Sequence, residues 1–452
     1  MRDWRGRLLR RWVDNMRTSL WFLPALMTAA GLFLCPLTIW ADAHLGLRAD
    51  GPFRYILYVS APDQARDLLA TLLTSMITMA SLVFSITVVV LTLASSQFGP
   101  RLIRNFMASF QTQFVLGTFM MTSLYCLLRL TSLGSRASGD PAAYISVSLA
   151  VVLSVTSLAL LVLYIHSLAT SIVSESLIKA VGKELDDGIK TLKRVDLPPF
   201  PEAPVPKDWP RTAAKVRLPK AGYVQAIEFD TISAAARKAD VLIFLSFKTG
   251  DFAVPDADPI GVYPPERATS ELARLLQRAV SLGVHRTPVQ DLEYSIRHLV
   301  EIAVRAMSPA INDPYTAVAV IQRLSAAWPH IFVRELPTGT IQDADGTPRV
   351  VFPPLSYRSL LKASFSQIRQ TAADKPFVLI HLLKVFEQLA HSTVTDEQRA
   401  DLEEQVHAVL EDAEREVANS QDLRDVRAQA RRAFDVLAQQ PSSDEDPMSI
   451  WQ

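Results

Sequence analysis

The chain has 452 residues, of which 49% are hydrophobic and 20% are charged. This is too apolar for an ordinary soluble protein and too charged for a wholly membrane-embedded one, so we expect a membrane part joined to a soluble part. The net charge is zero, yet residues 1–173 hold 13 Arg and 7 Asp with neither Lys nor Glu, and the remainder is slightly acidic. An acidic soluble part lacks the basic footprint of nucleic-acid binding, so no nucleic-acid partner is expected.

A basic segment at 1–18 is followed by four uncharged stretches, each long enough to cross a bilayer as a helix. The predicted membrane spans are 19–40, 68–96, 105–128 and 142–173. The two cysteines, Cys35 and Cys126, lie inside these spans, which excludes a disulfide framework or a zinc site. We therefore expect a polytopic α-helical membrane domain over 19–173 that contacts the lipid bilayer.

The flanking cations predict the orientation of the spans. Residues 1–17 carry six Arg against two Asp, and Arg101 and Arg104 follow the second span without a nearby acid. The 129–141 loop, with Arg129 and Arg136, favours the opposite orientation more weakly. The pattern predicts a multi-pass protein of the bacterial inner membrane with both termini in the cytoplasm.

The second predicted span carries hydroxyl residues at intervals of mostly three, four or seven, which is the spacing of one helix face. The stripe includes Thr71, Ser75, Thr78, Ser85 and Thr92, with further Ser or Thr at 74, 81, 95 and 96. Three interpretations stay open. The hydroxyls can pack helices closely, they can bond back to their own helix, or they can line a water-filled path in a homo-oligomer.

Within one subunit, the stripe could meet the fourth span, where Ser154, Ser157, His166 and Ser167 lie. In a ring of subunits it could conduct an ion or small solute, with Arg101 and Arg104 at the cytoplasmic mouth favouring anions. His166 is the one ionisable residue inside a predicted span and is thus a functional candidate. Its position near the cytoplasmic end, without a carboxylate in any predicted span, argues against a proton relay.

The cytoplasmic half is predicted to be an α+β domain. A juxtamembrane helix and a Pro-rich linker occupy 174–213, a small β-rich unit with one short helix occupies 214–264, and a disordered tail occupies 441–452. Between them, 265–440 is predicted to be a helical array. Its expected helices are 268–281, 288–307, 314–328, 356–372, 376–391, 396–418 and 421–439.

No motif for catalysis, a cofactor or a metal occurs in the chain, so we expect no enzyme activity. The most informative stretch is "MSPAINDPYTA" from Met307, which lies between two predicted helices. Ser308 before Pro309 ends the first helix, Asn312 or Asp313 caps the second, and Pro314 takes its first turn. A capped corner explains this stretch. Arg305 and other polar residues nearby also allow a ligand-binding or coupling corner.

The segment "RTPVQDLEYSIRHLVEIAVRAMSPAINDPYTAV", together with "LASSQFGPRLIRNF", "GYVQAIEFD" and "GDFAVPDADPIGVY", resembles the bacterial predicted membrane protein family catalogued as domain of unknown function 2254. The resemblance covers nearly the whole chain. It implies a multi-span membrane protein and brings no activity, cofactor or catalytic residue.

The function expected from these features is a homo-oligomeric channel or transport component with a large cytoplasmic regulatory domain. The alternative is a membrane-anchored sensor or scaffold whose cytoplasmic helical domain binds a ligand or a partner. The hydroxyl stripe favours the first, and the corner at 308–314 favours the second.

Overall fold

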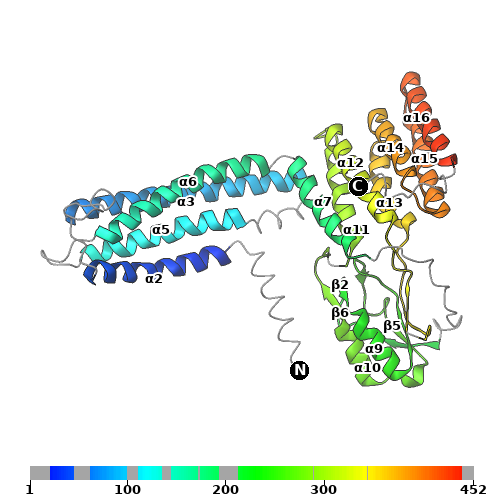
Figure 1. The fold of residues 1–452 in the computed structure, drawn as a ribbon, viewed down its shortest axis with the longest axis horizontal. Helices are drawn as coiled ribbons and strands as arrows, with labels where there is room; N and C mark the ends of the chain where they lie inside the picture. The colour runs from blue at the N-terminus through cyan, green and yellow to red at the C-terminus, as the bar shows by residue number, and fades with distance from the viewer. Residues whose placement is uncertain are drawn as a thin grey trace. The chain divides into compact units, whose positions relative to one another are not determined.

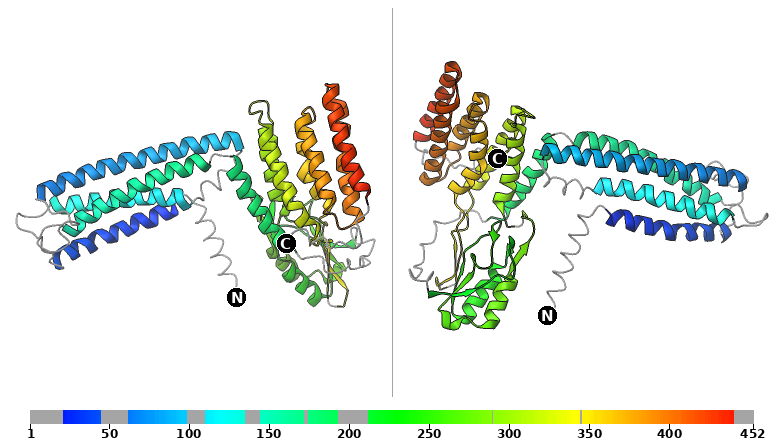
Figure 2. Two further views of the ribbon diagram at one scale, coloured as in Figure 1. Left: turned by 45° about the horizontal axis from the view of Figure 1, so that its top comes forward. Right: turned by 180° about the vertical axis from the view of Figure 1, so that it is seen from behind.

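The computed structural model describes residues 21–44, 62–98, 110–134, 144–171, 174–192, 212–288, 290–343 and 345–439. The predicted basic segment, Pro-rich linker, C-terminal tail and the pair Arg101 and Arg104 lie outside these ranges. The chain divides into two compact units, Met1–Val173 and Ser174–Gln452. Figures 1 and 2 show the helices of the first unit and the mixed helices and strands of the second.

The first unit contains four long helices, α2 (Phe22–His44), α3 (Pro62–Phe98), α5 (Phe110–Gly134) and α6 (Tyr144–Ser171). All four are long and apolar enough to cross a membrane. Each overlaps a predicted span, but α3 begins at Pro62, before the predicted start at 68, and α2 and α5 continue beyond the predicted ends at 40 and 128. These extensions bring Asp42 and Arg129, which we had assigned to loops, into the helices.

Helix α5 packs against each of the other three helices of this unit. It approaches α2 closely because both helices carry a glycine at the contact. A Cβ atom on Gly117 would lie 2.5 Å from Met27 Sδ, and one on Gly31 would lie 3.1 Å from Met121 Cγ. Small residues at such contacts let membrane helices approach through van der Waals packing, where lipid provides no hydrophobic driving force.

The second unit begins with α7 (Ser174–Lys190) and then forms a β-rich part. Its five-stranded sheet has the order β1 (Ala214–Val216), β5 (Ile260–Tyr263), β3 (Leu242–Leu245), β8 (Pro348–Val351) and β7 (Thr340–Gln342). A three-stranded sheet has the order β4 (Phe252–Ala253), β2 (Gly222–Ile227) and β6 (Val280–Gly283). Helices α9 (Phe229–Ala239) and α10 (Ser270–Ala279) and the 3₁₀ turn η1 (Pro265–Arg267) complete it.

The β-rich part draws on more of the chain than the predicted range 214–264. Strands β6, β7 and β8 come from the range predicted to be purely helical, and β8 pairs in parallel with β3 at Ile243 and Val350. The apolar side chains of α9, α10 and both sheets form one core. Strand pairs so distant in sequence are set by which surfaces meet, and local patterning does not specify them.

The helical array follows the predicted helices closely. It contains α11 (Leu292–Ala306), α12 (Pro314–Phe332), α13 (Tyr357–Thr371), α14 (Pro376–Ala390), α15 (Asp396–Glu416) and α16 (Ser420–Ala438). Trp328, Phe365 and Phe386 are fully buried in its core. Side chains that accept hydrogen bonds from the first turn fix the start of five of these helices, with Asp291, Asp313, Ser356, Thr395 and Asn419 as caps.

Candidate functional site

The hydroxyl stripe of α3 faces outward from the four-helix unit. Thr71, Thr78, Ser85 and Thr92 are exposed, and Ser75 is half-buried. Thr71 Oγ1 donates to Asp67 O at 2.8 Å, and Thr78 Oγ1 donates to Thr74 O at 2.9 Å. Ser75 and Thr92 also donate to the carbonyl one turn back. Such bonds satisfy a hydroxyl without a partner helix, so the stripe lies on the outer surface at little cost.

The predicted intramolecular partner of the stripe does not meet it. The fourth-span hydroxyls turn toward α5 or their own backbone. Ser157 Oγ lies 3.3 Å from Thr122 Oγ1, Ser167 Oγ donates to Gln111 Oε1 at 2.6 Å, and Ser154 donates to Ala150 O. His166 is exposed near the end of α6. Thr87 of α3, which we did not include in the stripe, does reach α6, where its hydroxyl bonds to the buried Tyr164 hydroxyl.

In the part of the first unit that the structure describes, the buried charged residues are Asp42 and Arg129, which the sequence reasoning missed. Asp42 Oδ2 lies 3.3 Å from Arg129 Nη2, and the two side chains are 2% and 0% exposed. Asp42 also accepts from Ile145 N at 2.9 Å and from Ser146 Oγ at 2.5 Å. It thereby provides an acceptor for a backbone N–H in the first turn of α6, which has no acceptor within the helix. Our statement that no span contains a carboxylate is wrong, because α2 extends to His44 and contains Asp42, and α3 begins at Pro62 and contains Asp63 and Asp67.

Ser146 joins three helices at this point. It accepts from Arg129 Nε at 2.7 Å while its own hydroxyl donates to Asp42. Its backbone carbonyl accepts from Tyr125 Oη at 2.9 Å, and Tyr125 Oη also lies 2.9 Å from Thr38 Oγ1. The network ties α2, α5 and α6 together and compensates both charges. A weak signal in the sequence was the pair Leu130 and Leu133, which continues the helical three-residue spacing of apolar residues past Arg129.

The predicted corner between α11 and α12 forms as a capped turn. Helix α11 ends at Ala306, and the Ser308 carbonyl accepts from Ile311 N and Asn312 N. Asn312 adopts a left-handed conformation with φ of 49°. Asp313 is the cap, because its two carboxylate oxygens accept from Thr316 N at 3.1 Å and from Thr316 Oγ1 at 2.6 Å. Pro314 takes the first helical position, as predicted.

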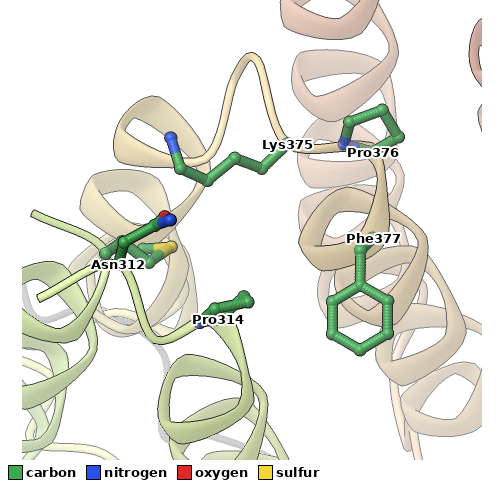
Figure 3. Close-up of a pocket in the computed structure, with 6 residues that line it drawn as sticks. Asn312, Pro314, Lys375, Pro376 and Phe377 are labelled. Carbon is green, nitrogen blue, oxygen red and sulfur yellow. The ribbon is translucent and has the colours of Figure 1, made fainter. Parts of the chain in front are cut away.

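Arg305 points into a local pair and does not join the corner. Its Nη2 lies 3.2 Å from Glu301 Oε1, one turn back on the same helix. The residues that line a hollow of about 200 Å³ beside the corner are Met307, Asn312, Pro314, Lys375, Pro376 and Phe377. Figure 3 shows the Lys375 side chain extending from the start of α14 toward the side where Asn312 lies.

The hollow is suited to contact rather than to chemistry. Its walls are mainly apolar, and the Lys375 amino group already donates to Asp374 Oδ1 at 2.6 Å. The rings of Tyr315 and Phe377 lie 5.3 Å apart beside it and are 73% and 42% exposed. Among the described residues, no cluster of His, Cys, Asp and Glu is placed to hold a metal ion.

A cluster of charges surrounds the start of α11. Arg286 Nε lies 2.5 Å from Asp291 Oδ2, Arg297 Nε donates to Glu293 Oε1 at 2.6 Å, and Lys248 Nζ lies 3.4 Å from Glu293 Oε2. The predicted helix start at 288 is wrong. Asp291 is the cap and accepts from Tyr294 N at 3.1 Å, because Gln290 takes a left-handed conformation that breaks the helix.

Burial acts on both acids of this cluster. It raises the pKa of Asp291 above the ordinary value, although Arg286 opposes it. Burial also acts to raise the pKa of Glu293, but Arg297, Lys248 and Arg286 together lower it below the ordinary value. Lys248 comes from the turn between β3 and β4, so the cluster joins the β-rich part to the helical array.

Comparison with known proteins identifies relatives over almost the full length. The family model described as "Predicted membrane protein (DUF2254)" matches residues 17–388. The uncharacterized proteins Mb1321c of Mycobacterium bovis and Rv1290c of Mycobacterium tuberculosis are each 30% identical to the chain over 440 residues. The alignment covers 94% of this chain and 82% of either relative. No solved structure matches the chain.

Proposed function

The chain belongs to the DUF2254 family of predicted membrane proteins, and from that premise we propose that it is a homo-oligomeric channel or transport component of the bacterial inner membrane. The observation that supports this proposal is the outward direction of the α3 stripe. Thr71, Thr78, Ser85 and Thr92 are exposed on a single chain, and the hydroxyls of α6 pair elsewhere. In an oligomer, several such faces would surround a shared wet path for an ion or small solute.

The proposed orientation places both chain ends in the cytoplasm. Of the two cations that favoured the opposite orientation, Arg129 is the one nearer to a span. Its charge is compensated by Asp42 inside the helices. It therefore does not count among the loop cations that set topology. A reporter fused after residue 195 should give a cytoplasmic signal, and one inserted near residue 50 a periplasmic signal. Reversed signals would refute the orientation.

Cysteine accessibility tests the shared wet path. Ser75→Cys, Thr78→Cys and Ser85→Cys are made singly in a Cys35→Ala, Cys126→Ala background and treated with a water-soluble thiol reagent in proteoliposomes. Modification with a change in ion flux is the expected result. Val155→Cys gives the matched control, because Val155 is exposed on α6 among apolar side chains and should stay inert in lipid.

The opposite result is equally clear. If the three positions within α3 stay inert while Thr92→Cys near the end of the stripe reacts, the hydroxyls serve packing or bond only to their own helix. The channel proposal then fails. A subunit count in nanodiscs tests the oligomer separately, and a monomer would exclude any path that several α3 helices share.

A second function is favoured by the corner of the array. In this alternative, the protein is a membrane-anchored sensor or scaffold, and the hollow beside Asn312 and Lys375 receives a partner. The exposed rings of Tyr315 and Phe377 support it, because exposed aromatic groups beside polar ones are common in binding surfaces. Loss of function in a stably folded Tyr315→Ala variant, with ion flux unchanged, would favour the sensor over the channel.

A further inference from the structure

We propose that α7 is a coupling helix. Arg323 of the helical array binds it, and this contact links the array mechanically to helix α6. The inference deepens the proposed function by naming a route of regulation, and it rests on that proposal for its physiological meaning. The link itself is a property of the fold. It can therefore be tested without measuring transport.

Helix α7 is an integral part of the array core. Ile178, Val181, Leu185 and Ile189 follow one another at intervals of three and four residues and are all buried in the same core as α11 and α12. Because these side chains are buried, α7 is not a solvated linker, which would have no buried apolar face. The predicted juxtamembrane helix is therefore also part of the helical array.

Arg323 of α12 contacts α7 at Gly182. Its Nη2 atom donates to the Gly182 carbonyl oxygen at 2.5 Å and lies 2.6 Å from Asp186 Oδ1. A Cβ atom on Gly182 would lie 2.0 Å from Arg323 Nε, so the absence of a side chain there is what admits the guanidinium. A second arginine, Arg334, donates to Leu192 O at 3.0 Å just past the helix end.

The chain allows little slack between α7 and the membrane unit. Residues 172 and 173 alone separate Ser171, the last residue of α6, from Ser174, the first of α7. Three Cα–Cα steps span at most roughly 11 Å. A displacement of α6 larger than this connection tolerates must therefore move α7 or pull it from Arg323. The same grip would let a ligand-induced change in the array act on α6.

The test compares two glycine variants of the full chain in nanodiscs by hydrogen–deuterium exchange. Gly182→Ala displaces Arg323 while it favours the helical state of α7, because Ala is the better helix former. Gly188→Ala is the matched control, since its Cβ would meet only Leu292 Cδ1 at an ordinary 3.4 Å. Arg323→Lys is the second test variant, which keeps the charge but removes the guanidinium Nη2 atom that contacts both the Gly182 carbonyl and Asp186.

We expect Arg323→Lys to speed exchange in α7 by roughly tenfold, and Gly182→Ala to speed it by a smaller factor because Ala also stabilises the helix. A smaller increase is expected in the C-terminal part of α6, at residues 160–167. Gly188→Ala should leave both segments at least as protected as in the wild type, because it introduces no clash and Ala favours the helix. Unchanged exchange in α7 would show that Arg323 does not hold the helix. Faster exchange in α7 with α6 unchanged would show a passive tether. Either result overturns the inference, whatever the outcome of the flux experiment.

Discussion

Arg129 of α5 forms an ion pair with Asp42 of α2 at 3.3 Å, and neither side chain has appreciable contact with solvent. In such a pair each charge is tolerated because the other is present. Removing one partner leaves an uncompensated buried charge, and removing both restores neutrality. The pair therefore predicts a strongly non-additive response to mutation.

Arg129→Ala should lower the free energy of unfolding of the membrane unit by roughly 3–5 kcal/mol, since Asp42 remains buried without its cation. The double variant Asp42→Asn, Arg129→Met should be clearly more stable than Arg129→Ala. Denaturant unfolding of the purified chain in detergent measures both. Arg66→Ala, at an exposed position of α3, provides the control. If the double variant is no more stable than Arg129→Ala, the two residues are not coupled.

Asp313 should behave as a helix cap. Asp313→Ala removes the acceptor for Thr316 N and Thr316 Oγ1, which should cost roughly 0.5–2 kcal/mol of stability, and Asp313→Asn or Asp313→Ser should largely restore it. Thermal unfolding of the full chain measures the series. A stably folded Asp313→Asn variant that has lost function would instead assign the carboxylate to ligand binding or coupling.

Asn312 should tolerate glycine better than a branched residue. Its φ of 49° lies in the left-handed region, which Asn and Gly accept and which β-branched side chains resist. Asn312→Gly should leave stability nearly unchanged, while Asn312→Val should cost about 1–2 kcal/mol. The same unfolding assay distinguishes them. Equal stability of the two variants would mean that the corner relaxes, and that the turn does not constrain the hollow.

The charge cluster at α11 predicts an acid-sensitive contribution from Glu293. Its pKa is lowered below the ordinary value of 4.5, so the folded state holds the proton less tightly than the unfolded state. Its stabilising contribution is therefore present above pH 4.5 and is lost as the pH falls below that value, through the lowered pKa. Asp291 acts in the opposite sense, because burial raises its pKa and its contribution is lost as the pH rises through that raised pKa.

Glu293→Gln should consequently destabilise the chain most at neutral pH, with the difference from wild type shrinking as the pH falls below 4.5. Arg297→Gln, which removes the principal partner of Glu293, should show the same trend. Unfolding measured across the acid range tests both variants. A difference between Glu293→Gln and wild type that does not change with pH would mean that the Glu293 carboxylate is not stabilised by these cations.

The sequence by itself determined the features that a few neighbouring residues encode. The apolar runs located the four long apolar helices, and apolar periodicity placed α13 and α14 within one residue of their observed ends. Pro314 located the helix start in the same way and limited the cap to Asn312 or Asp313, of which the structure shows Asp313. These features are local, because helix periodicity and capping depend on residues within one or two turns.

Tertiary structure decided what joins distant segments. Asp42 and Arg129 are 87 residues apart. They pair because α2 and α5 both continue past their predicted ends and carry these two residues. The parallel contact of β3 with β8, the grip of Arg323 on Gly182 and the outward direction of the α3 stripe likewise depend on which surfaces pack together. Periodicity fixes the face on which a side chain lies, but only the packed fold determines what that face meets.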